Sequence, residues 1–301
     1  MDGIINVYKE AGFTSFDVVA KLRGILKQKK IGHTGTLDPE AEGVLPVCIG
    51  KATKVCEYLT NKDKVYQAVL HLGITTDTYD SSGSIVKEQN AEITEEELRQ
   101  LIAGFTGRQK QVPPMYSALK VNGRKLCELA RQGIEVERKA REIEIFSIEI
   151  CSIQMPLVTL RVHCSKGTYI RSLCHDIGEQ AGCGGCMEKL LRIQAAGFLV
   201  RDTYRLHEIE AIVKGTDPAG RSLSEILLPV DRVLLEYPKA AAKSGMEKQL
   251  ANGCQIPADK TLQAGAYTEG IYRLYDSMGK FVGLYRYEAK NRVFRPEKMF
   301  C

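Results

Sequence analysis

The 301-residue sequence predicts an α+β protein that ends in a small all-β domain. Two observations carry this prediction. Strand-like and helix-like segments alternate over the first 230 residues, whereas the tail places glycines at short intervals between β-rich pieces such as 272–275 and 281–287. The length also suits about two domains of ordinary size. We expect these domains at residues 1–232 and 233–301.

The individual elements follow from apolar periodicity and from capping signals. Thr14 or Ser15 can begin the first helix, and Thr94 with Glu97 forms a capping box for another. Thr168 is expected to cap a further helix, and Asn122-Gly123 indicates a turn. Strands are expected at 4–8, 65–72, 142–152, 157–164 and 190–200, and helices at 15–28, 95–105, 125–132, 169–178 and 206–213.

Composition excludes several classes of protein. Hydrophobic residues make up 44% and charged residues 26% of the chain, which is ordinary for a globular protein. The longest stretch without Asp, Glu, Lys or Arg has 12 residues, at 65–76, whereas a spanning helix needs about 20 apolar residues. The N-terminus lacks the features of a signal peptide. We therefore expect a cytoplasmic protein without a membrane partner.

Ten cysteines are scattered through the chain, and only Cys183 and Cys186 form a C-x-x-C pair. A structural zinc site usually needs two such pairs. A zinc site or a redox pair remains an alternative, but we favour reduced free thiols and expect no metal. The sequence also contains no Walker A motif, no G-x-G-x-x-G and no H-E-x-x-H, so neither a nucleotide cofactor nor a catalytic metal is expected.

Positive charge is concentrated in two places. The segment 105–141 has nine basic and three acidic residues, a net charge of +6 against +5 for the whole chain. A second cluster lies at residues 21–30, with five basic residues and no acidic one. Such clusters can bind a polyanion, or they can simply be solvated faces.

The segment 31–45 combines glycines and a proline with several polar side chains, and it follows a basic helix. Asp38 precedes Pro39, which keeps Asp38 out of the helical region and would present its carboxylate from extended backbone. Alternatively, Asp38 only caps a helix that begins at Pro39. These residues by themselves do not decide between the two interpretations.

Three weaker signals lie further along the chain. In the segment 164–171 a strand ends at a glycine turn, so Tyr169 and Arg171 could face a ligand from the first turn of a helix or be merely exposed. Tyr66 opens a strand and could stack on a base. Leu191 lies in an apolar run that most simply fills a core.

Taken together, these segments resemble the TruB family of tRNA pseudouridine synthases. The resemblance runs in order from about residue 3 to 235, and the tail is similar to the family's PUA-like domain. It implies a pseudouridine synthase fold, with a mixed, largely antiparallel sheet flanked by helices. The matching segments are GHTGTLDPEAEGVLPVCIGKATK at 32–54, KVYQAVLHLG at 64–73, TDTYDSSG at 76–83, PPMYSALKVNGRKLCELARQGIEVERKAR at 113–141 and HCSKGTYIRSLCHDIGE at 163–179.

The resemblance assigns roles to particular residues. It implies that Asp38 is the nucleophile, which suits a reaction that detaches uracil at N1 and rejoins it at C5. Arg171 matches the arginine that pairs with this carboxylate, and Tyr66 matches the aromatic residue that stacks on the target base. His33 matches the histidine beside the flipped nucleotide, and Leu191 matches an apolar wall of the uridine pocket. Tyr169, Lys9 and Arg131 are further candidates for substrate binding.

The implied substrate is uridine 55 in the T-loop of tRNA, which must be flipped out before it can react. The basic segment 105–141 matches an insertion that folds over the T-arm.

We expect no cofactor and no obligate protein partner, and we expect a monomer. A tRNA-folding chaperone, in which catalysis is secondary, is the alternative function. One departure from the family is Glu10, which stands where proline is usual and leaves the position of Lys9 open.

Overall fold

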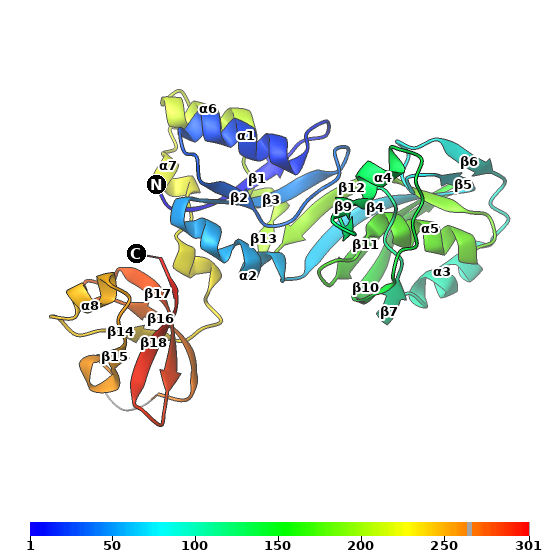
Figure 1. Cartoon of the computed structure of the whole chain (residues 1–301). Helices are drawn as coiled ribbons and strands as arrows, with labels where there is room; N and C mark the ends of the chain where they lie inside the picture. Colours follow the sequence, from blue (N-terminus) through cyan, green and yellow to red (C-terminus); the bar gives the residue numbers. More distant parts are fainter. Residues whose placement is uncertain (264–266, 301) are drawn as a thin grey trace.

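A computed structural model of the chain describes residues 1–263 and 267–300, and it contains a large mixed sheet and a smaller C-terminal sheet (Figure 1). The prediction of an α+β protein with a mixed sheet flanked by helices is confirmed. Residues 264–266 and 301, which belong to the predicted C-terminal domain, lie outside the described residues.

The large sheet runs in the order β1-β3-β12-β4-β11-β10-β7, with β2 paired to β3 and β13 to β12. The pairing of β3 with β12 is parallel, and the other pairings are antiparallel. The sheet is therefore mixed but largely antiparallel, as expected. Its strands are β1 (Gly3–Lys9), β2 (Ile31–His33), β3 (Glu42–Ile49), β4 (Lys64–Leu72), β7 (Gly107–Gln111), β10 (Arg141–Gln154), β11 (Leu157–Cys164), β12 (Gly185–Ala195) and β13 (Phe198–Leu199).

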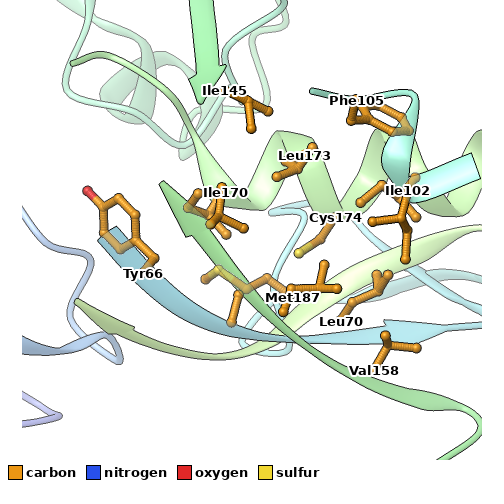
Figure 2. Close-up of a cluster of buried hydrophobic side chains, with 14 of the residues drawn as sticks. Tyr66, Leu70, Ile102, Phe105, Ile145, Val158, Ile170, Leu173, Cys174 and Met187 are labelled. Atoms are coloured by element: carbon orange, nitrogen blue, oxygen red, sulfur yellow. The ribbon is translucent and has the colours of Figure 1, made fainter. Parts of the chain in front are cut away.

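Helices cover the two ends of this sheet and form separate cores with it (Figure 1). At one end α1 (Ser15–Leu26) and α6 (Leu206–Lys214) pack on β1–β3 through buried aliphatic residues. At the other end α3 (Glu95–Ala103) and α5 (Ile170–Gln180) pack on β4, β10 and β11, in the cluster shown in Figure 2. The remaining helices of this part are η1 (Gly50–Val55), α2 (Cys56–Thr60), α4 (Leu126–Ala130), η2 (Val200–Asp202), α7 (Leu223–Ile226) and η3 (Val230–Val233).

The C-terminal sheet runs in the order β14-β16-β17-β18-β15 and has its own aromatic core. The strands expected near 272–275 and 281–287 are present as β16 and β17, and the architecture is PUA-like. The elements are β14 (Lys239–Ala241), α8 (Glu247–Ala251), β15 (Ile256–Pro257), η4 (Ala258–Lys260), β16 (Gly270–Tyr275), β17 (Phe281–Glu288) and β18 (Val293–Met299).

Several local predictions are confirmed and a few are wrong. The capping box of Thr94 with Glu97 is present at α3. The cap of α5, however, is Tyr169, because the Thr168 hydroxyl donates a hydrogen bond to the carbonyl of Ser165 instead, at 3.0 Å. Strand β12 also begins five residues earlier than expected, at Gly185, since pairing with β4 extends it beyond its apolar stretch.

The basic segment 105–141 divides into two parts. Its first residues form β7, an edge strand of the large sheet that pairs with β10. The sequence of β7, Gly-Arg-Gln-Lys-Gln, has no apolar alternation, so only its pairing reveals it as a strand. Residues 112–140 lie outside this sheet. They contain a two-stranded hairpin, β8 (Lys120–Val121) and β9 (Arg124–Lys125), with Asn122-Gly123 at its turn as predicted, followed by α4.

A second small hairpin, β5 (Ile74–Thr76) with β6 (Ile85–Glu88), follows β4. Among the described residues no helix is both long and apolar enough to span a bilayer. The same residues include no group of three or more His, Cys, Asp or Glu side chains placed to hold a metal ion, and both Cys183 and Cys186 are buried free thiols.

Candidate active site

Asp38 lies in the loop between β2 and β3, and the side chain of Lys9 holds the backbone of this loop. The Lys9 ammonium is fully buried and donates hydrogen bonds to the carbonyls of Pro39, at 2.8 Å, and Ala41, at 2.5 Å, as well as to that of Glu10. Burial lowers the pKa of Lys9 to about 8, against the opposing charge of Asp38. Lys9 thus binds the loop backbone. These hydrogen bonds fix the position of Lys9, which the replacement of the usual proline by Glu10 had left open.

The loop backbone presents Asp38 without a helix. Residues 39–40 form a turn, and the Asp38 carbonyl accepts a hydrogen bond from the Ala41 amide at 3.1 Å. The alternative that Asp38 caps a helix at Pro39 is therefore wrong. On the other side of Asp38, the Leu37 amide donates to the hydroxyl of Ser15 at 2.9 Å, which ties the loop to the start of α1.

The Asp38 carboxylate forms a two-point ion pair with Arg171 of α5. Oδ2 lies 2.9 Å from Arg171 Nε, and Oδ1 accepts a hydrogen bond from Nη2 at 3.0 Å. The Arg171 side chain is only 4% exposed, so the alternative of an exposed arginine is wrong, whereas the Asp38 side chain remains 37% exposed. The carboxylate thus has one side bound by protein and one side open to a ligand.

Further contacts hold Arg171 itself in place. Its guanidinium donates to the carbonyls of Thr78, at 3.1 Å, and Tyr116, at 2.8 Å, and Nη1 lies 3.6 Å from a carboxylate oxygen of Asp80. Sequence reasoning missed Asp80, although it belongs to the segment TDTYDSSG. Tyr116 brings residues 112–140 into direct contact with the site.

Two opposing effects set the pKa of Asp38. Burial raises the pKa of its carboxyl, and the negative charge of Asp80 adds to the rise. The positive charge of Arg171 and its hydrogen bond oppose that shift. The net direction is upward, although Arg171 lies close to both carboxylate oxygens.

Tyr66 lies at the start of β4, at the edge of the hydrophobic cluster, with its hydroxyl pointing away from the other labelled side chains (Figure 2). Burial raises the pKa of Tyr66, and the charge and hydrogen bond of Arg192 oppose the rise. Arg192 is the register partner of Tyr66 in β12 and is only 1% exposed.

Arg192 also connects Tyr66 to the backbone around Asp38. Its guanidinium donates to the carbonyl of Val44, at 2.7 Å, and to that of Gly35 in the Asp38 loop, at 3.1 Å. Sequence reasoning missed this residue because it sits in an apolar run that indicates only a core strand. A charged residue at a position that should be buried was the one available signal.

The other predicted residues surround this centre. His33 is the last residue of β2, and its Nδ1 accepts a hydrogen bond from the Gly35 amide at 3.3 Å. Burial and the positive charge of Arg192 lower the pKa of His33. Tyr169 precedes α5, and its backbone is held by the Gln111 side chain in two hydrogen bonds. Burial raises the pKa of Tyr169.

Leu191 and Arg131 occupy less central positions. Leu191 pairs with Glu42 of β3 and Gln67 of β4, next to Arg192. Arg131 ends α4, outside the large sheet, and the contacts described above do not connect it to the Asp38 and Arg171 pair.

Comparison with known proteins identifies the family. Residues 23–170 match the sequence model of the TruB family pseudouridylate synthase (N terminal domain), and residues 171–235 match that of the tRNA pseudouridylate synthase B C-terminal domain. The chain belongs to the TruB family. It is a tRNA pseudouridine synthase, an isomerase that forms pseudouridine in tRNA.

Relatives of this TruB family member match over nearly the whole chain. A tRNA pseudouridine synthase B of Lachnoclostridium phytofermentans is 52% identical over 312 residues, covering 100% of both chains. The protein of the same name from Clostridium kluyveri is 45% identical and covers 94% of this chain and 95% of its own. A solved Cbf5-Nop10-Gar1 complex contains a chain with a TM-score of 0.73 and 27% identity, covering 99% of this chain and 85% of that one.

Proposed function

We propose that this enzyme converts uridine 55 in the T-loop of tRNA to pseudouridine, with Asp38 as the nucleophile. The observation that carries the proposal is the ion pair of Asp38 with Arg171, in which the buried arginine leaves one side of the carboxylate open. In the proposed reaction a carboxylate oxygen forms a covalent bond to the bound uridine. The N1–C1′ bond breaks, the uracil turns and the C5–C1′ bond forms. The bond to the carboxylate then breaks, C5 loses its proton and N1 gains one, which gives free Asp38 and pseudouridine.

The neighbouring side chains have separate parts in this proposal. Tyr66 stacks on the uracil and, as a phenolate that the positive charge of Arg192 stabilises, receives the C5 proton late in the reaction. Leu191 and Tyr169 line the uridine pocket. Lys9 acts through the Pro39 and Ala41 carbonyls, by holding the loop that carries Asp38.

Recognition of the T-arm requires that the base leave its stack. His33 is proposed to fill the gap, because its lowered pKa keeps the imidazole neutral and able to stack at neutral pH. Residues 112–140 are proposed to fold over the T-arm, with Arg131 among the cations that contact its phosphates. The hydrogen bond between Tyr116 and Arg171 supports this proposal, since it would couple RNA contact to the geometry of the nucleophile.

The test is release of tritium from an unmodified tRNA transcript labelled at uracil C5, because forming the C5–C1′ bond expels that hydrogen. Wild type should release one equivalent, Asp38→Asn none, and a transcript with cytidine at position 55 none from either protein. Release that persists with cytidine at position 55 would place the reaction at another uridine. Tight tRNA binding without any release would instead favour the tRNA-folding chaperone.

A further inference from the structure

A basic surface at the end of α1 plays no part in the site described above. Residues 18–37 contain Lys21, Arg23, Lys27, Lys29 and Lys30 and no acidic residue, a net charge of +5 that equals that of the whole chain. All five side chains are exposed. We call these five residues the α1 basic cluster.

The cluster forms no ion pair among the described residues, although Lys21 interacts electrostatically with Asp17 and Glu210 at longer range. No carboxylate of residues 1–263 or 267–300 lies within ion-pair distance of any of its five cations. The two acidic side chains that line the adjoining groove form ion pairs with other residues, Glu10 with Arg205 at 2.6 Å and Glu210 with Lys214 at 2.6 Å. An anion that approaches this surface therefore finds free positive charge.

The shape of the surface also suits an anionic group. A shallow hollow of about 430 Å³ is lined by Arg23, Lys27, Gln28 and Lys29. The Arg23 guanidinium lies over the ring of Phe16, 5.7 Å from its centre, and Phe16 is itself 62% exposed. Contact with the ring restrains the arginine, so less side-chain entropy is lost when it binds a ligand.

The backbone at Lys27 argues against a purely structural role. Lys27 ends α1 in the left-handed region, with φ of 48°, where glycine is the usual residue. A residue with a side chain is less stable in this conformation than glycine. The helix dipole explains a cation in the last turn, such as Arg23, but it does not explain a lysine at the strained cap followed by Lys29 and Lys30.

Hydrogen bonds connect the elements around the cluster to both the active site and the C-terminal domain. The start of α1 is bonded to the Asp38 loop through Ser15 and Leu37, and twelve helical residues span about 18 Å. The Lys30 carbonyl accepts a hydrogen bond from Gly50 at the start of η1, and Lys54 of η1 bonds to the Met299 carbonyl of β18.

We propose that the α1 basic cluster binds the phosphate backbone of the tRNA outside the arm that enters the Asp38 site. This inference rests on tRNA being the substrate, and it does not depend on which uridine reacts. Arg23 can bind one phosphate through two nitrogens, and the lysines add point charges beside it. The substrate is a polyanion larger than the active site, so a second contact on an element bonded to the Asp38 loop would orient it.

The experiment compares two triple variants that remove the same charge. The cluster variant, Arg23→Gln/Lys27→Gln/Lys29→Gln, removes the three positive charges that line the hollow. The control variant, Lys87→Gln/Arg99→Gln/Arg161→Gln, removes three exposed positive charges from β6, α3 and β11. Both are built on Asp38→Asn so that the RNA is not converted. Binding is measured for a full-length unmodified tRNA transcript and for an isolated T-arm hairpin, across a series of salt concentrations.

The cluster variant should bind full-length tRNA about tenfold more weakly near 0.15 M salt, with a salt slope about 2 units smaller. Its affinity for the hairpin, and the control variant's affinity for both RNAs, should change less than about twofold. Equal affinity of cluster and control variants for full-length tRNA would overturn the proposal. Equal losses for tRNA and hairpin would overturn it as well, since the contact would then lie within the T-arm.

A single substitution separates folding from binding. Lys27→Gly relieves the left-handed cap and should raise the melting temperature by a few degrees, while it weakens full-length tRNA binding about two- to threefold. A gain in stability with unchanged tRNA affinity would assign Lys27 no part in the surface. When Asp38 is restored in the cluster variant, tritium release at saturating tRNA should equal that of wild type. This measurement distinguishes a failure of the phosphate-binding proposal, which concerns affinity, from a failure of the proposed reaction, which concerns release.

Discussion

Arg171 binds Asp38 through Nε and Nη2, although 133 residues separate them in the chain. The carboxylate comes from a loop that Lys9 anchors, and the guanidinium comes from a buried position on α5. The same guanidinium is bonded to the Thr78 and Tyr116 carbonyls. Any change at this arginine therefore alters the nucleophile, the 76–83 segment and residues 112–140 together.

Replacing Asp38 by asparagine should abolish turnover while tRNA binding stays within a few fold. Asparagine has nearly the same shape, but its amide cannot form the covalent bond to uridine. Tritium release and equilibrium tRNA binding measure the two effects. Turnover above a few per cent of wild type would remove Asp38 from the role of nucleophile.

Arg171→Lys should lower kcat by about 100-fold or more with a smaller change in KM. A lysine keeps the charge but cannot bond simultaneously to the carboxylate and to the two carbonyls that the guanidinium now holds. Arg161→Lys is the matched control, because Arg161 forms an exposed ion pair with Glu149 at 2.9 Å. Equal activity of the two variants would argue that charge alone suffices at position 171.

The acid side of the pH–rate profile should report Asp38. Because its pKa is raised, the reactive carboxylate becomes protonated, and activity falls, at a higher pH than for an ordinary aspartate. Asp80 contributes to that rise, so Asp80→Asn should move the acid side to lower pH. Single-turnover rates across pH measure the shift, with Asp77→Asn in the same segment as control. An acid side that stays in place, or moves upward, would contradict this assignment.

Lys9 should make stability depend on pH in the alkaline range. Its pKa is about 8 in the folded protein against 10.5 for an ordinary lysine, so between these values the unfolded chain binds more protons. The free energy of unfolding should therefore rise with pH over this window, by about 1 kcal/mol per pH unit. Urea unfolding of wild type and Lys9→Met at pH 8 and pH 10 tests this, and the rise should be absent from the methionine variant. Parallel pH dependence in both proteins would exclude Lys9 as its source.

Tyr66→Phe should slow turnover by about 10²-fold and leave tRNA binding nearly unchanged. Phenylalanine retains the ring that stacks on the base but lacks the oxygen that receives the proton. Arg192→Met should lower kcat in the same way, because it removes the charge that opposes the raised pKa of Tyr66. If the fold-decrease in kcat of the double variant equals the product of the two single fold-decreases, the residues act independently and the proposed coupling is wrong.

Much of the fold could be predicted because its elements carry local signals. The capping box at Thr94 and the Asn122-Gly123 turn depend on neighbours a few residues away. Strand β7 and the start of β12 could not be predicted, because their pairing partners lie far along the chain and their own sequences lack alternation.

The sequence by itself determined the family, the candidate residues and the two concentrations of positive charge, since each is a matter of residue type and order. Only the tertiary structure decided that Asp38 caps no helix, that Arg171 is buried against it and that Asp80 and Arg192 join the site. It also showed that Lys9 binds the backbone of the Asp38 loop and that the α1 basic cluster forms no ion pair among the described residues. The physical reason is that burial and charge pairing depend on distance in space, which a linear pattern of residues does not contain.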